Sequence, residues 1–146
     1  MYHYLESGLP NIWLKNGYVE QQTPYGKTIA IDDLLGLHRT IALALIEKPR
    51  KLNGAEIRFL RTEMELSQSA LAGLIGVTAQ SIALWEKDKS GITGPAEKLI
   101  RLIVKGHFNG NATIRRAIDV LNGLDAAHHQ ARLIFQEHGK KWSHAA

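Results

Sequence analysis

A chain of 146 residues suffices for one domain, or one domain with a small appendage, and its 45% hydrophobic content is ordinary for a globular protein. It has no cysteine, which excludes a disulfide framework, a thiolate nucleophile and a cysteine-ligated zinc site. The net charge of +4 is spread as +1, +1 and +2 over residues 1–53, 54–106 and 107–146, so there is no basic block that would bind nucleic acid by charge alone.

The sequence predicts neither a signal peptide nor a membrane-spanning segment. The opening Met1-Tyr-His-Tyr-Leu-Glu6 lacks the basic and apolar regions of a signal peptide. No apolar run approaches the roughly 20 residues that cross a bilayer. We therefore expect a cytoplasmic protein that does not bind a membrane.

Residues 1–31 predict a three-stranded meander. Asn16-Gly17 between two short apolar runs is typical of a two-residue type I′ hairpin, because both residues tolerate a positive φ. Thr23-Pro24-Tyr25-Gly26 predicts a second turn, and Lys27–Ile31 a third strand. We interpret Trp13, Tyr18 and Tyr25 as core of this meander, with a partner interface as the alternative.

A helix is expected next, capped by Asp32 or Asp33 and ending before Pro49. The apolar residues predicted to face inward are Leu34, Leu35, Leu37, Ile41, Ala42, Leu45 and Ile46. The cations that follow, Lys48, Arg50 and Lys51, are interpreted either as phosphate contacts or as a solubilising cluster. A further helix should begin at Asn53 or Gly54, with Ile57, Leu60, Arg61 and Met64 at helical spacing.

The stretch from Leu66 to Glu86 predicts two short helices around a tight turn. Ser67 is a hydroxyl in N-cap position, Gly76 suits a left-handed turn and Thr78 can cap the second helix. Two helices joined by a short Gly-containing turn form the helix-turn-helix unit.

The second of these helices has two distinct sides at 100° per residue. Ile82 and Trp85 lie on the inner side. The outer side is small and uncharged, and its Gln80 can make the paired bonds to an adenine edge that only an amide offers. Ala79 and Leu84 can contact a thymine methyl, and Ser81 suits a base or a phosphate. This face is expected to enter a major groove, with Lys87 and Lys89 reaching phosphates beyond it.

The stretch resembles the Xre/phage-repressor (Cro-like) class of helix-turn-helix regulators. The matching residues are Ser67-Gln68, Ala72, Gly76-Val77-Thr78, Ile82 and Trp85-Glu86. The resemblance implies that Gln68 and Thr78 bind phosphates and that Ala79, Gln80, Ser81 and Leu84 face bases. Two positions depart from it: Leu84 replaces a common polar reader, and Lys87-Asp88 replaces the usual Gly after the Glu, so the exit turn is expected to differ.

Gly94-Pro95 should open another helix, with Leu99, Leu102 and Ile103 inward, and residues 106–110 are read as a break. Beyond the break a heptad seam indicates a dimerisation helix, or else a helix folded back on its own domain. Asn122-Gly123 can split it into two. The seam positions are Ile114, Ala117, Leu121, Leu124, His128, Ala131 and Phe135.

Catalytic patterns are lacking. The seven histidines show no metal-ligand spacing, Asp32-Asp33 is better read as a helix cap than as an acid/base pair, and no phosphate loop or nucleophile motif occurs. We therefore expect no enzyme, no cofactor and no metal. His128 could sense pH, but a solvated or hydrogen-bonded histidine is the simpler interpretation.

The order of parts over residues 1–105 also resembles MqsA-type antitoxins, in which a small β-containing region precedes an Xre-type domain. The zinc cysteines of that family are missing, so no metal site is implied. The resemblance implies an N-terminal region that grips a toxin protein while the helix-turn-helix represses the operon.

These observations predict a mainly α fold: a lambda-repressor-like helix-turn-helix bundle (residues 51–106) between a β-meander plus helix (1–50) and a C-terminal helical segment (107–146). The predicted function is a sequence-specific repressor that reads double-stranded DNA as a homodimer. The alternative is an antitoxin that neutralises a partner toxin and regulates its own operon.

Overall fold

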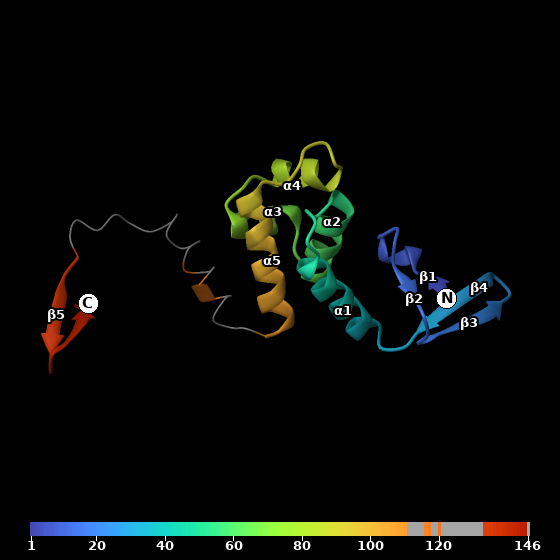
Figure 1. Cartoon of the computed structure of the whole chain (residues 1–146), viewed down its shortest axis with the longest axis horizontal. Helices are drawn as coiled ribbons and strands as arrows, with labels where there is room; N and C mark the ends of the chain where they lie inside the picture. Colours follow the sequence, from blue (N-terminus) through green and yellow to red (C-terminus); the bar gives the residue numbers. More distant parts are fainter. Residues whose placement is uncertain (111–115, 118–119, 121–132, 146) are drawn as a thin grey trace.

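The computed structural model describes residues 1–110, 116–117, 120 and 133–145 (Figure 1). Helices dominate the described part, so the predicted mainly α class is confirmed. The elements are β1 (Tyr2–His3), the 3-10 turn η1 (Leu5–Ser7), β2 (Trp13–Leu14), β3 (Tyr18–Thr23), β4 (Gly26–Ile31), α1 (Leu34–Glu47), α2 (Gly54–Glu63), α3 (Gln68–Ile75), α4 (Ala79–Glu86), α5 (Gly94–Phe108), β5 (Phe135–His138) and β6 (Lys141–His144).

The N-terminal strands form two separate antiparallel pairs, β1 with β2 and β3 with β4, so the predicted three-stranded meander is wrong. A type I′ turn needs positive φ at both central residues. Only Gly17 has one (81°), and its carbonyl instead accepts the Asp32 N–H at 2.8 Å. The turn at Pro24-Tyr25 is confirmed: it joins β3 to β4, and Thr23 Oγ1 donates to the Gly26 carbonyl at 2.7 Å.

Helix α1 begins where the sequence predicts, because Asp33 Oδ1 accepts the Gly36 N–H at 3.2 Å. The buried side chains begin only at Ile41 and recur at helical spacing to Ile46, where α1 packs against α2 and α5. Leu34 and Leu35, predicted to face inward, are exposed, Leu35 to 84%. Leu37, one turn before Ile41, still packs against the core, whereas these first two residues do not, so periodicity alone misplaces them.

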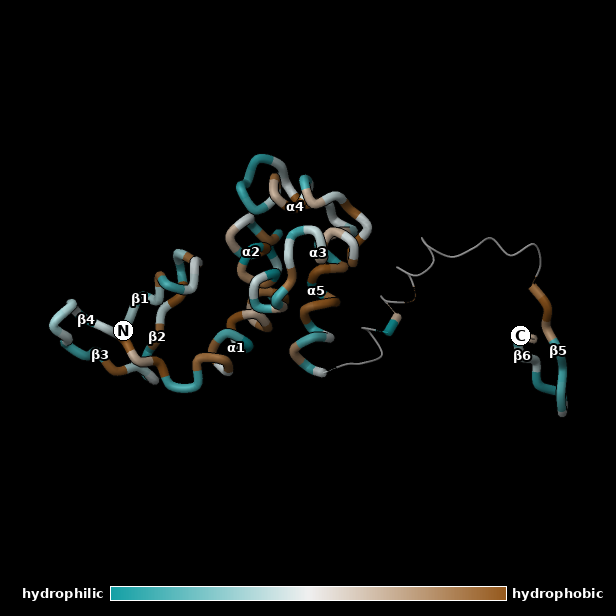
Figure 2. Tube along the Cα trace, turned by 180° about the vertical axis from the view of Figure 1, so that it is seen from behind, coloured by the Kyte–Doolittle hydropathy of each residue, from teal (hydrophilic) through white to brown (hydrophobic). Residues whose placement is uncertain are grey.

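One hydrophobic core joins the helices, with Leu60, Leu71, Ile82 and Ile100 fully buried at its centre. Hydrophobic residues concentrate along α1, α3 and α5, whereas the loop after α4 is hydrophilic (Figure 2). The core also takes in Tyr4, Leu9 and Leu14 from the N-terminal segment. The N-terminal segment is therefore packed against the helices through these side chains.

Helix α5 starts at Gly94-Pro95 as predicted and ends at Phe108, within the break predicted over residues 106–110 but after Gly106, where that break was expected to begin. Gly106 is buried inside the helix, and the chain turns only at Gly110, whose φ is 67°. Leu102 is exposed rather than inward, because the buried stripe passes through Ala96, Ile100, Ile103 and Val104.

Residues 135–138 and 141–144 form the β5–β6 hairpin, joined by Gly139 and Lys140 at positive φ. Phe135, assigned to the heptad seam, therefore lies in a strand and not in a helix. Ala117 has helical backbone. The other seam positions, and the Asn122-Gly123 split, lie outside the described residues.

Candidate nucleic-acid interface

Local hydrogen bonds cap the first turns of α3 and α4. Ser67 Oγ accepts the Ala70 N–H at 3.0 Å, and Thr78 Oγ1 accepts the Ser81 N–H at 3.1 Å. Gly76 sits between the helices at φ 74°, and its N–H donates to the Ala72 carbonyl. A side chain at this left-handed position would be strained. The two predicted caps and the predicted glycine turn are confirmed.

The inner side of α4 anchors the helix in the core. Ile82 is fully buried and Trp85 is 5% exposed. Gln80 and Leu84, on the opposite side, are exposed, Leu84 to 39%. The neighbouring Ala79, Ser81 and Ala83 are half-buried, and Thr78 is exposed. The uncharged outer surface of α4 is thus open.

An ion pair at the carboxyl end of α4 ties together three helices. Arg61 of α2 donates two hydrogen bonds to Glu86, from Nε at 2.6 Å and Nη2 at 2.9 Å, and a third to the Leu66 carbonyl at 3.0 Å. Gln68, at the start of α3, donates to the same carboxylate at 3.2 Å. The bond to Glu86 raises the pKa of Arg61 above its ordinary value. The forked geometry holds α4 in one orientation.

This network is not predicted by the sequence pattern. The pattern places Arg61 in a helical stripe without a partner, and the family resemblance implies a phosphate contact for Gln68. The sequence hint of a buried ion pair was that Arg61 lies at helical spacing among apolar residues. Its carboxylate partner is 25 residues away, so spacing within one helix could not reveal it.

The turn that leaves α4 is built differently from a glycine turn. Asp88 takes the left-handed conformation, with φ 55°, and its Oδ1 accepts the Gly54 N–H at 2.8 Å. Lys87 and Lys89, on either side of it, are exposed. The exit turn at Lys87-Asp88 therefore differs from a glycine turn, as expected, because the Asp88 side chain also caps the first residue of α2.

Residues 57–102 match the family model described as helix-turn-helix. This segment is a helix-turn-helix domain of the Xre/Cro-like class. The match begins within α2 and ends within α5, so it includes the α3–α4 unit and the Glu86 network. No curated protein and no solved structure matches the chain significantly. A helix-turn-helix domain of this class is a DNA-binding regulator domain.

The three cations before α2, Lys48, Arg50 and Lys51, differ in their surroundings. Lys48 pairs with the buried carboxylate of Glu56, which neither of the two interpretations of the cluster anticipated. Arg50 and Lys51 are exposed. A Cβ atom built on Gly91, in the loop after α4, would lie 3.2 Å from Lys51 Nζ, so this amine sits beside that loop.

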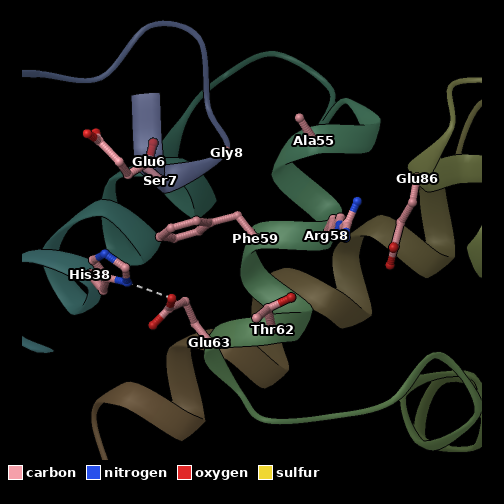
Figure 3. A pocket seen from close by; sticks show the side chains of 10 residues that line it. All are labelled: Glu6, Ser7, Gly8, His38, Ala55, Arg58, Phe59, Thr62, Glu63 and Glu86. Atoms are coloured by element: carbon pink, nitrogen blue, oxygen red, sulfur yellow. Dashed lines mark hydrogen bonds and ion pairs between the residues drawn. The ribbon is translucent and has the colours of Figure 1, made fainter. Parts of the chain in front are cut away.

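A second feature is a cleft of about 610 Å³ between η1 and α2, shown in Figure 3. Beside it runs a chain of hydrogen bonds: Tyr4 Oη lies 2.7 Å from His38 Nε2, and His38 Nδ1 lies 2.6 Å from Glu63 Oε1. Burial raises the pKa of the Tyr4 phenol. Since these groups bond one another, the chain of bonds links the N-terminal segment to α1 and α2.

The described residues contain no group of three or more His, Asp or Glu side chains placed to hold a metal ion. In the same part of the chain, no helix combines the length and apolar character needed to cross a membrane.

Proposed function

We propose that this protein is a sequence-specific transcriptional repressor that inserts α4 into the DNA major groove as a homodimer. The observation that carries the proposal is the open, uncharged outer side of α4, held in place by Ile82, Trp85 and the Glu86 ion pair. A surface without long charged side chains allows the helix backbone to approach base edges closely.

Base reading falls to four side chains on that surface. Gln80 is exposed and carries both a donor and an acceptor, which match the N6 and N7 atoms of adenine. Ala79 and Leu84 supply apolar contacts suited to thymine methyl groups. Ser81 Oγ lies 3.0 Å from Thr78 Oγ1, so the two hydroxyls form one polar site at the start of α4.

Phosphate contacts fall to the ends of the two helices. Thr78 is exposed beside the first turn of α4, and Lys87 and Lys89 are exposed after its last turn. Gln68 uses one amide hydrogen on Glu86 and retains a second donor for a phosphate. Gln68 would then link the DNA backbone to the network that orients α4.

Dimeric binding would place two copies of α4 on half-sites about 34 Å apart, one helical turn of DNA. The β5–β6 hairpin supports a further contact between copies, since Phe135 and Trp142 are 58% and 71% exposed on it. Repression would follow from occupying promoter DNA.

The test begins with selection of bound fragments from the source genome, which gives both the site and its symmetry. On that site, Gln80→Ala should lose about 1–3 kcal/mol, roughly 5- to 150-fold in Kd, mainly at one base pair. Lys87→Ala should weaken binding to all sequences alike. Gln22→Ala, an exposed amide on β3, is the matched control and should bind as wild type.

If Gln80→Ala bound native and scrambled DNA as wild type does, the base-reading role of α4 would be refuted. A palindromic site that binds one protomer only would refute the dimer while leaving base reading intact.

A second candidate function is that of an antitoxin, because apolar side chains are exposed on and beside the N-terminal strands. Trp13 is 55% exposed and stacks on His3 at 4.0 Å, Tyr25 is fully exposed, and Leu35 lies bare at the start of α1. Large aromatic side chains of this kind commonly anchor protein interfaces. For Trp13 and Tyr25, the interpretation as core of a meander is wrong.

The antitoxin function predicts a gene for a small toxic protein next to this one. Expression of that protein should arrest growth, and co-expression of this chain should restore it. The double variant Trp13→Ser/Tyr25→Ser should fail to restore growth while still binding DNA. Rescue by the double variant at wild-type level would exclude these two side chains from the toxin contact.

A further inference from the structure

The segment between α1 and α2, residues 48–53, is fixed in place although it has no regular secondary structure. Arg101 of α5 donates to the carbonyls of Ile46 (2.7 Å), Lys48 (2.8 Å) and Arg50 (2.7 Å). On the other side of Lys51, the Leu52 N–H donates to Glu97 at 3.1 Å, and the Leu52 side chain is buried. Lys51 is therefore presented from a backbone held on both sides.

This fixed segment places Lys51 beside the loop that follows α4. Its Nζ lies 3.2 Å from where a Cβ of Gly91 would be, and Lys89 is two residues before Gly91. Lys51 is thus placed beside the loop that follows α4, although it lies 36 and 38 residues before Lys87 and Lys89 in the chain.

The acidic side chains around this point are already engaged. Asp88 accepts the Gly54 N–H, Glu97 binds Arg101 and the Leu52 N–H, and Glu86 binds Arg61. By contrast, over the continuous stretch 1–110, no ion pair involves Lys51, Lys87 or Lys89. Asp88 keeps its negative charge, but Lys51, Lys87 and Lys89 outnumber it, so a local excess of exposed positive charge remains.

We infer that the α1–α2 segment is part of the DNA interface and that Lys51 binds a backbone phosphate beside those bound by Lys87 and Lys89. The inference rests on the proposed DNA-binding function and extends it to a residue outside the matched helix-turn-helix segment. Arg101 and Glu97 act as positioning residues for Lys51. A phosphate contact adds affinity without sequence preference, so it fixes the protein on the duplex while α4 reads the bases.

The experiment measures Kd for full-length protein on its selected site and on scrambled duplex at several salt concentrations. Each phosphate neutralised contributes about 0.9 to the slope of log K against log salt. Lys51→Gln should lower the slope by about that amount and weaken both duplexes by the same factor. That factor should be roughly 3.5-fold larger at 50 mM than at 200 mM salt.

Lys15→Gln removes the same charge from an exposed position after β2 and is the matched control, expected to keep the wild-type slope. Thermal unfolding of Lys51→Gln should match wild type because the side chain is exposed. A wild-type slope for Lys51→Gln, while Gln80→Ala still loses sequence-specific binding, would overturn this inference and leave the proposed function standing. Failure of wild type to bind any duplex would overturn both.

Discussion

Gly54 of α2 lies in close contact with the backbone of α4, and substituting it by alanine tests the packing of the helix-turn-helix domain. A Cβ atom at this position would lie 2.5 Å from the carbonyl oxygens of both Trp85 and Glu86. Ordinary Cβ contacts lie at 3.4–4 Å, so the two helices would have to separate by about 1 Å. Both oxygens belong to the backbone and cannot rotate away.

We expect Gly54→Ala to destabilise the protein, although helix propensity alone would favour alanine. Alanine in place of glycine within a helix is favourable by up to about 1 kcal/mol. Overpacking a tight contact costs about 1–3 kcal/mol, and the separation would also stretch the 2.8 Å bond from the Gly54 N–H to Asp88. We therefore expect Gly54→Ala to lower the free energy of unfolding by about 1–2 kcal/mol.

Gly73→Ala is the matched control, because Gly73 lies inside α3 with nothing within 4 Å of a Cβ. It should raise the free energy of unfolding by about 0.5–1 kcal/mol. Urea unfolding followed by circular dichroism at 222 nm measures both values. Equal stabilisation by the two substitutions would show that α2 and α4 do not approach as closely as described.

Two further substitutions test charged groups. Glu86→Gln should lower the free energy of unfolding in urea by about 2–4 kcal/mol, because it leaves the mostly buried Arg61 without its counter-charge. The double variant Arg61→Met/Glu86→Leu should recover most of that loss. A loss below about 0.5 kcal/mol for Glu86→Gln would show that the ion pair does not hold α4. The hydrogen bond to Glu6 raises the pKa of Tyr2 to about 12, so this bond contributes stability that is present below pH 10 and lost as pH rises through 12. In Glu6→Gln the Tyr2 pKa, read by NMR titration of the phenol carbon, should fall toward 10; an unchanged value would exclude Glu6 as the cause.

The parts of the fold that could be predicted are those set by residues close together in the chain. Asp33, Asn53, Ser67 and Thr78 each accept a backbone N–H three residues ahead, and Gly76 takes a conformation that disfavours other residues. Such interactions need no knowledge of the rest of the molecule. The inward placement of Ile82 and Trp85 follows from helical periodicity in the same way.

The failures have a common cause in contacts between distant segments. Strand β2 pairs with β1 rather than with β3, and Leu34, Leu35 and Leu102 are apolar residues on helix faces that no neighbouring element covers. Periodicity says that a helix has an apolar side but cannot say how far along the helix its neighbours extend.

The sequence by itself determined where the helices begin, the turn of the helix-turn-helix and the side chains on the outer side of α4. Only the tertiary structure decided how that helix is held and what lies beside it. Glu86 meets Arg61 across 25 residues, Gly54 meets Asp88 across 34, and Arg101 holds the Lys51 segment from about 50 residues away. Partners so far apart leave no periodic trace in the chain, because their contact depends on how the packed helices are oriented.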